Sequence, residues 1–203
     1  MEPDSANSDS IAVVAGPRPA AALEPIAAPA APRRTSGAVL WFRDLFISAL
    51  ASIFIITFLY QPVRVEGTSM LPRLEDSDRL FINKFVYHFS AIERGDVVVF
   101  RSPEDLDRSF IKRVIALPGD RVRVDHGRVI VNGKPLREPY VLMEYRDNNS
   151  MAEITIPQDC YFMMGDHRNI SYDSRAFGPV SRSLVYGKAV FVIWPKRDVG
   201  TVR

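Results

Sequence analysis

The sequence contains very little cysteine or histidine, the residues whose disulfides and metal sites stabilise many small folds. Cys160 is the only cysteine among 203 residues, which excludes an internal disulfide framework. His88, His126 and His167 stand far apart in the chain, and no cysteine and histidine pair has zinc-ligand spacing. Because an isolated cysteine usually packs as a small apolar residue, we assign Cys160 no chemistry. The sequence therefore predicts no metal and no cofactor.

An excess of charge of one sign is also missing. The chain has 26 basic and 24 acidic residues and a formal net charge of +2. Nucleic-acid binders usually carry a strong basic bias, so we predict no nucleic-acid partner.

Large apolar side chains are scarce in residues 1–37, which are rich in alanine and proline and show no apolar period. Such a segment cannot bury enough surface to offset the entropy of ordering. We predict a disordered tail that contains the Arg33–Arg34 pair near its end.

Residues 38–60 contain the one long apolar run, and Leu45–Tyr60 carries no charge. As a helix the run from Val39 to Tyr60 would be about 33 Å long, close to the hydrocarbon thickness of a bilayer. The side chain of Arg43 would reach the interface. The sequence predicts one transmembrane anchor.

Two other interpretations of this run are a core helix of a soluble domain and a cleaved signal peptide. Arg43 and Asp44 shorten the apolar stretch, as a core helix would allow. Ala49-Leu50-Ala51 resembles a cleavage site, but it lies inside the apolar run. An uncleaved anchor fits better.

The orientation of the anchor is weakly determined by charge. Arginines precede it at 18, 33, 34 and 43 and follow it at 64, 73 and 79, which only leans toward a cytoplasmic N-terminus.

Residues 61–203 alternate short apolar runs with turn signals, which is typical of a mainly β domain. Asn132-Gly133 is the strongest hairpin signal. The predicted strands are Val97–Arg101, Phe110–Ile115, Arg121–Val124, Val129–Val131, Glu153–Ile156, Tyr161–Met164 and Ala189–Trp194.

A serine lies on a glycine-containing turn after the alternating run Val63–Glu66. Ser69 could act there as a nucleophile, although most serines in turns bond the backbone. It needs a base, and no histidine shows the spacing of a catalytic triad.

A lysine lies within the apolar segment Ser109–Ile115. If it is buried, Lys112 loses hydration, which favours the neutral amine and makes it a usable general base. Strand parity does not decide whether Lys112 or Arg113 points inward. Only the lysine can serve as a base, because a guanidinium stays protonated.

A third polar cluster, Gly165–Gly178, follows the apolar strand Tyr161–Met164. Together the three clusters resemble the signature boxes of bacterial type I signal peptidases. These are Gly-x-Ser-Met-x-Pro at 67–72, Phe-Ile-Lys-Arg-Val-Ile-x-Leu-Pro-Gly-Asp at 110–120 and Gly-Asp-x-Arg-x-x-Ser-x-Asp-Ser-Arg at 165–175. The resemblance covers residues 39–194, and the last two boxes are highly specific.

The resemblance implies a serine endopeptidase that removes signal peptides from exported preproteins. Ser69 would attack the scissile carbonyl and also donate its backbone N–H to the oxyanion. Lys112 would act as general base, and Ser171 would orient the lysine amine. The residues implied as an ion-pair frame are Asp166, Arg168, Asp173 and Arg175.

The resemblance also implies an antiparallel β-sheet catalytic domain on the extracytoplasmic face of the cell membrane, with a small β insertion at about 121–161. The substrate would be an extended peptide beside Val63–Glu66 and Phe110–Lys112, cut after small residues in an Ala-x-Ala pattern. The residues implied to line its pockets are Val63, Val65, Met70, Leu74, Phe110 and Ile111. The expected partners are preproteins and membrane lipid.

The sequence departs from the commoner family pattern at a few positions. Gly67 stands where many members have a serine that completes the oxyanion hole, so the second donor is open. Arg73 replaces a threonine, and Asn169-Ile170 replaces an Asp-Asn pair. None of these changes removes a catalytic group.

Two alternatives remain. A self-cleaving repressor protease of the LexA type shares the Gly-x-Ser-Met turn and a downstream lysine, but the apolar anchor and the box at 165–175 disfavour it. A membrane-tethered β module that binds peptides without cutting them would retain its function when Ser69 and Lys112 are replaced by alanine.

Overall fold

The computed structural model describes residues 37–202, apart from the side chains of 56–60 and 196. The predicted tail therefore lies outside the described residues, except for Gly37. The helix α1 spans Gly37–Leu59 and is long and apolar enough to cross a membrane. None of its apolar window is buried inside the protein, unlike the core helix of a soluble domain.

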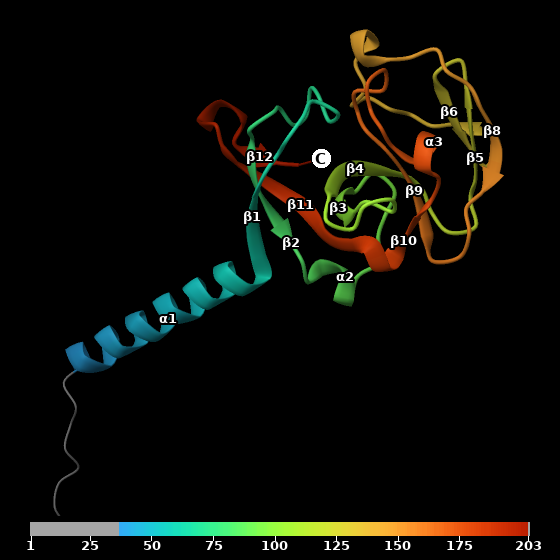
Figure 1. The fold of residues 1–203 in the computed structure, drawn as a ribbon. Helices are drawn as coiled ribbons and strands as arrows, with labels where there is room; N and C mark the ends of the chain where they lie inside the picture. Colours follow the sequence, from blue (N-terminus) through green and yellow to red (C-terminus); the bar gives the residue numbers. More distant parts are fainter. Residues whose placement is uncertain (1–36, 203) are drawn as a thin grey trace, which may run out of the picture. The chain divides into compact units, whose positions relative to one another are not determined.

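The rest of the described chain is built on two antiparallel sheets (Figure 1). Eight strands of the described residues form the larger sheet, in the order β1-β2-β11-β3-β4-β9-β10 with β12 paired to β11. Their bounds are β1 Tyr60–Arg64, β2 Arg79–Asn83, β3 Val97–Arg101, β4 Ser109–Ala116, β9 Cys160–Met164, β10 Val180–Ser181, β11 Val185–Trp194 and β12 Gly200–Thr201.

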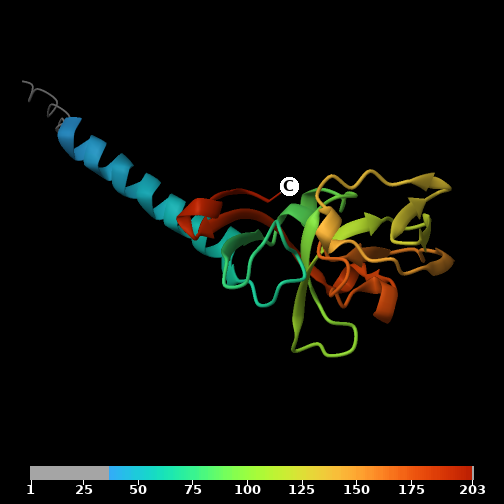
Figure 2. The ribbon, with the colours of Figure 1, turned by 90° about the horizontal axis from the view of Figure 1, so that it is seen from above.

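The smaller sheet lies at the end of the β domain away from β1 and β2, as both views show (Figures 1 and 2). Its order is β7-β6-β5-β8. The bounds are β5 Arg121–Asp125, β6 Arg128–Val131, β7 Lys134–Pro135 and β8 Met151–Thr155. Short helical segments complete the domain: α2 Val86–Phe89, α3 Ser174–Phe177, η1 Met143–Tyr145, η2 Arg182–Leu184 and η3 Lys196–Asp198.

The predicted fold class, mainly β and antiparallel with one apolar helix at its start, is confirmed. Strand β3 has the predicted bounds, and the other six predicted strands differ by one to four residues at an end. The Asn132-Gly133 hairpin forms between β6 and β7, with both residues at positive φ as such a tight turn requires. Strand β2 was missed, and the strand expected at Val63–Glu66 is shifted to Tyr60–Arg64.

Strand β3 explains why the sheet is covered on both faces. Val97–Phe100 is a continuous run of buried residues, and successive side chains of a strand point to opposite faces. Val97 and Val99 belong to one apolar cluster, and Val98 and Phe100 belong to another. Side chains on either face of the neighbouring strand β4 are therefore buried as well.

Candidate active site

Ser69 lies on a loop that is tied to the beginning of β2. The amide of Val65 donates to the Asp78 carbonyl at 2.8 Å, and the amide of Ser77 donates back to Val65 at 2.9 Å. Gly67 has a φ of +90°, a conformation that residues with a side chain rarely adopt, and its amide donates to the Asp76 carboxylate at 2.8 Å. The turn that presents the serine therefore has a fixed shape.

Two apolar side chains anchor this turn in the core. Met70 is 2% exposed and Leu74 is fully buried, both in the cluster that includes Val65. The Leu74 amide donates to the Met70 carbonyl at 3.0 Å and closes one helical turn just after the serine. Ser69 itself stays half-buried beside a cavity.

Lys112 approaches the serine from β4, where it pairs with Val98 of β3. Its side chain is only 3% exposed, and its Nζ lies 2.6 Å from Ser69 Oγ. Burial lowers the pKa of Lys112 to about 8, because the ammonium loses its hydration. The negative charges of Asp173 and Asp166 oppose this shift, and Arg175 adds to it. Near neutral pH, part of the lysine is thus a neutral amine.

Lys112 and Arg113 point to opposite faces of β4. The lysine contacts Ser69, and the arginine, also buried, forms a two-point ion pair with Asp166 at 2.8 and 2.6 Å. Arg113 also donates to the Gly95 carbonyl at 2.9 Å and lies 4.1 Å from the ring centre of Tyr140. The two basic residues are on opposite faces, and both faces are covered.

The loop after β9 contacts the nucleophile through its backbone. The His167 amide donates to the Ser69 carbonyl at 3.0 Å, and the His167 Nδ1 lies 3.0 Å from the Thr68 carbonyl. The Tyr145 ring packs on this imidazole, with centroids 4.2 Å apart. No role for His167 in the site was predicted from the sequence. Its place between Asp166 and Arg168 of the third box was the only available signal.

Ser171 lies on the same loop with its hydroxyl buried. Within residues 37–202 the Oγ has no protein hydrogen-bond partner, so it makes no bond to Lys112 in this structure. A Cβ added to Gly165 would overlap both the Ser171 Oγ and the Ser69 carbonyl oxygen. Gly165 thus permits the close approach of the serine loop and the loop 165–171.

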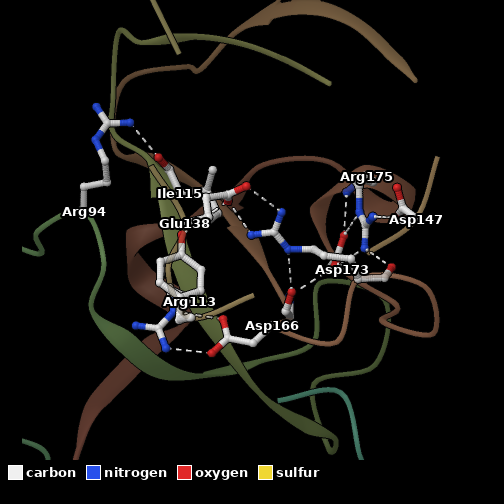
Figure 3. A network of polar contacts seen from close by, with 11 residues as sticks. Arg94, Arg113, Ile115, Glu138, Asp147, Asp166, Asp173 and Arg175 are labelled. Atoms are coloured by element: carbon white, nitrogen blue, oxygen red, sulfur yellow. Dashed lines mark hydrogen bonds and ion pairs between the residues drawn. The ribbon is translucent and has the colours of Figure 1, made fainter. Parts of the chain in front are cut away.

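The implied frame residues form buried ion pairs (Figure 3). Asp166 pairs with Arg113, and Arg168 pairs with Glu138 at 2.5 Å, with both partners in each pair almost fully buried. Arg168 also donates to the Gly165 carbonyl at 2.9 Å. None of these carboxylates or guanidinium groups is hydrogen-bonded to Ser69 or Lys112 in the part of the chain that the structure describes.

A second part of the frame is centred on Asp173. Its carboxylate accepts from the Gly165 amide at 3.1 Å and pairs with Arg175 at 2.8 Å. Arg175 also pairs with Asp147 and donates to the Arg168 carbonyl at 2.8 Å. The sequence analysis named the four residues of the third box, but their partners Arg113, Glu138 and Asp147 were not expected. Glu138 and Asp147 come from the segment between β7 and β8, where no pattern marked them.

The cavity beside Ser69 has a volume of about 470 Å³ and is lined by residues of β1 and β4. Strand β1 is the last strand of the large sheet, and β4 pairs with β9 only from Arg113 onward. Within the described residues, no strand pairs with Ser109–Lys112 on the side away from β3. An extended chain could therefore hydrogen-bond to either edge.

The lining of this cavity includes most of the expected pocket residues. It contains Val63, Val65, Met70, Phe110 and Ile111. Leu74 does not line it, because its side chain is fully buried beneath the serine turn.

The backbone N–H of Ser69 donates no hydrogen bond within the described residues, so it is available to an oxyanion. Gly67 has no side chain to offer as a second donor. No cluster of His, Cys, Asp and Glu that could hold a metal ion occurs in residues 37–202.

Comparison with known proteins places this chain in a family. Residues 38–194 match the family described as "Signal peptidase, peptidase S26". A "Signal peptidase I" of Leptolyngbya laminosa is 38% identical over 185 residues, covering 87% of this chain and 90% of the relative. "Signal peptidase I P" of Bacillus subtilis subsp. natto is 34% identical over 174 residues, covering 80% and 92%. A crystal structure of a signal peptidase I from Enterococcus faecalis V583 is 31% identical, with a TM-score of 0.43, covering 49% of this chain and 97% of that one.

Proposed function

Because this chain belongs to the signal peptidase family, peptidase S26, we propose that it removes signal peptides from preproteins with a Ser69–Lys112 dyad. The family makes it a serine peptidase. The observation that carries the residue assignment is the 2.6 Å distance between Lys112 Nζ and Ser69 Oγ in a buried setting.

Acylation would begin with transfer of the Ser69 hydroxyl proton to the neutral Lys112 amine while Oγ attacks the scissile carbonyl carbon. The tetrahedral oxyanion would receive the Ser69 N–H, a contribution of about 3 kcal/mol in comparable sites. The Lys112 ammonium would then return a proton to the leaving amine as the peptide bond breaks. This leaves an acyl ester on Ser69 and a neutral lysine.

Deacylation would use the same base a second time. Lys112 would take a proton from water, and the resulting hydroxide would attack the ester carbonyl. Collapse of the intermediate would release the product as a carboxylic acid while the Lys112 proton returns to Ser69 Oγ. The carboxylic acid would then lose its proton to the solvent. A Lys112 pKa of about 8 suits both accepting and returning the proton, because the amine and the ammonium are both populated near neutral pH.

Ser171 would act as a positioning residue for the lysine. Its buried hydroxyl has no other protein partner within the described residues, so it is available to bond the amine when Lys112 turns away from Ser69. Its loop is fixed to the nucleophile through the His167 amide.

The substrate would lie extended between β1 and β4, with main-chain hydrogen bonds to the two free edges. Alternate substrate side chains would then face the apolar wall formed by Val63, Val65, Phe110 and Ile111. The family resemblance implies pockets for small side chains here, so we expect cleavage after Ala-x-Ala.

Helix α1 would anchor the enzyme in the cell membrane as a single span. The N-terminus would be cytoplasmic, and residues 61–203 would form the extracytoplasmic peptidase domain, with about 121–161 as its β insertion. Preproteins would be cleaved at that face of the membrane.

The test is cleavage of a preprotein with an Ala-x-Ala site by the purified full chain in detergent. Lys112→Ala should lower kcat by at least about three orders of magnitude, because the base is lost. Lys134→Ala is a matched control, since Lys134 is an exposed lysine of β7 away from the cavity. Equal activity of the wild type and Lys112→Ala would contradict the dyad, and would favour a peptide-binding module. Cleavage of its own chain alone would favour the self-cleaving type.

A further inference from the structure

A second cavity, of about 710 Å³, adjoins the first and has a strongly basic lining. Lys84, Arg101 and Arg182 contribute to its walls together with His88. No aspartate or glutamate of the described residues lines it. The two cavities share Ser109 and Tyr186 as a common wall. The peptidase mechanism uses none of these cations.

Within the described residues, these three positive charges have no acidic partner. In residues 37–202 no ion pair joins Lys84, Arg101 or Arg182 to a carboxylate. A solvated face usually mixes both signs of charge, whereas a concave basic site raises the local concentration of anions. The chemistry of this cavity therefore fits an anionic ligand.

Arg182 is already held in place. Its Nη2 donates to the Tyr87 carbonyl at 2.8 Å, and its guanidinium carbon lies 5.6 Å from the centre of the Tyr87 ring. A weaker contact joins Nη1 to the Val185 carbonyl at 3.4 Å. A guanidinium has five N–H donors, so others stay available to a phosphate without loss of side-chain freedom on binding.

Exposed aromatic side chains stand beside these cations. Phe85 is 40% exposed and Phe89 is 88% exposed, at the two ends of the α2 turn. The Asn83 Oδ1 accepts from the Phe85 and Val86 amides at 2.9 and 3.0 Å, which fixes the turn that presents them. Aromatic rings next to basic residues are typical of surfaces at the interface of a bilayer.

The chain itself places this cavity near the membrane. Gln61 lines the cavity and is the second residue after Leu59, the last residue of α1. Two residues span no more than about 8 Å. If α1 crosses the bilayer, as proposed above, the cavity lies at the level of the lipid headgroups.

We propose that this cavity binds the phosphate of an anionic phospholipid. Phe85 and Phe89 would contact the lipid where its headgroup meets the acyl chains. This inference rests on the membrane anchoring proposed for α1, and it does not depend on the peptidase activity. A zwitterionic headgroup fits less well, because its choline cation would face the uncompensated charges of Lys84, Arg101 and Arg182. Through Ser109 and Tyr186 the bound lipid would hold the cleavage cavity at a fixed depth relative to the membrane.

The experiment measures lipid binding to the purified full chain in a neutral detergent by native mass spectrometry. Dioleoyl phosphatidylglycerol is the anionic probe, and dioleoyl phosphatidylcholine is the zwitterionic one. The test variant is Lys84→Gln/Arg101→Gln, in which both side chains are exposed. Each basic residue near an anionic surface contributes about fivefold, so the Kd for phosphatidylglycerol should rise about 25-fold.

The matched control is Arg128→Gln/Lys134→Gln, which removes two exposed charges from the small sheet. It should leave the Kd within about twofold of the wild type, since only nonspecific attraction changes. Cleavage of a short soluble peptide should be unchanged in the test variant, which verifies its fold.

Three results would overturn the proposal. One is equal wild-type affinity for the two lipids, and another is equal loss in the test and control variants. The third is unchanged lipid binding with a raised KM for substrates that carry acidic residues, which would assign the cavity to the peptide. Failure of the proposed peptidase activity would appear separately, as absent cleavage with lipid binding intact.

Discussion

At the scale of single residues, the proposed dyad requires a particular protonation state of Lys112 before Ser69 can be activated. An ammonium has no lone pair, so only the neutral amine can accept the hydroxyl proton. The side chain is buried and has lost most of its hydration, which lowers its pKa to about 8. The Ser69 Oγ lies 2.6 Å from Lys112 Nζ, within hydrogen-bond reach of the amine.

The first prediction concerns pH. Because the active form is the neutral amine, kcat/KM should rise with pH and level off above an apparent pKa near 8. The acid limb should have a slope of one, since one proton is removed. A steady-state profile of the free enzyme between pH 5 and 10 measures this. An acid limb centred near the pKa of free lysine, about 10.4, would contradict the buried base.

Gly165 is a second important residue, because the space around it leaves no room for a side chain. Its backbone does not have a positive φ, so the constraint is contact and not conformation. An added Cβ would overlap the Ser69 carbonyl oxygen and the Ser171 Oγ, and neither neighbour is the free end of a flexible chain.

We therefore expect Gly165→Ala to displace the serine loop and lower kcat by at least about a hundredfold, since small misplacements of catalytic groups have such effects. Peptide cleavage assays measure it. Gly200→Ala is the control, because Gly200 has open space around its Cβ position and no positive φ. Normal activity of Gly165→Ala would show that the loop 165–171 does not position the nucleophile.

At the scale of elements, buried ion pairs connect the loop after β9 to the rest of the β domain. Arg113 of β4 reaches Asp166 at the beginning of this loop, and Arg168 reaches Glu138 from the segment after β7. These pairs connect β4, which carries Lys112, to the loop that contacts Ser69. Their partners are distant in sequence and close only in the fold.

Removing one member of such a pair leaves an uncompensated buried charge. Asp166→Asn should therefore lower the free energy of unfolding by about 3–5 kcal/mol, because Arg113 is 2% exposed and loses its counter-charge. Urea denaturation monitored by circular dichroism measures the change.

The matched control for this change is Glu153→Gln, which breaks an exposed ion pair with Arg121. It should change the stability by less than about 1 kcal/mol. Equal small effects in both variants would mean that the buried pair contributes little.

At the scale of the whole molecule, one apolar helix and one β domain set the topology. Helix α1 is the only described segment with the length and composition of a membrane span. If α1 spans the membrane as proposed, the β domain lies on one side of the bilayer. The charge bias only leans toward a cytoplasmic N-terminus.

Protease protection tests the topology directly. In inverted membrane vesicles the β domain should be enclosed and resist added protease until detergent is present, because we expect it on the extracytoplasmic face. In right-side-out vesicles it should be accessible. Immunoblotting with an antibody against the C-terminal part distinguishes the two results. Digestion in intact inverted vesicles would reverse the proposed orientation.

The sequence by itself determined the class of the fold, and it predicted Ser69 and Lys112 as the reacting side chains of the proposed mechanism. The apolar run of α1, the short β-branched runs and the Asn132-Gly133 turn carry their structural preference locally, so they could be predicted. Strand β2 was missed because its apolar run is only three residues long, Leu80–Ile82, with Arg79 and Asn83 at its ends. Leu74 was an expected pocket residue because it follows the serine box closely, but its side chain is buried and does not line the cavity.

Only the tertiary structure decided which of Lys112 and Arg113 points toward Ser69. Both side chains are buried, and strand parity alone does not distinguish their two faces. It also supplied the partners Glu138 and Asp147, the role of Gly165 and the contact of His167 with the serine turn. These depend on contacts between segments far apart in the chain. A local pattern records which side chain is present, whereas burial, a shifted pKa and a counter-charge come from what the fold places beside it.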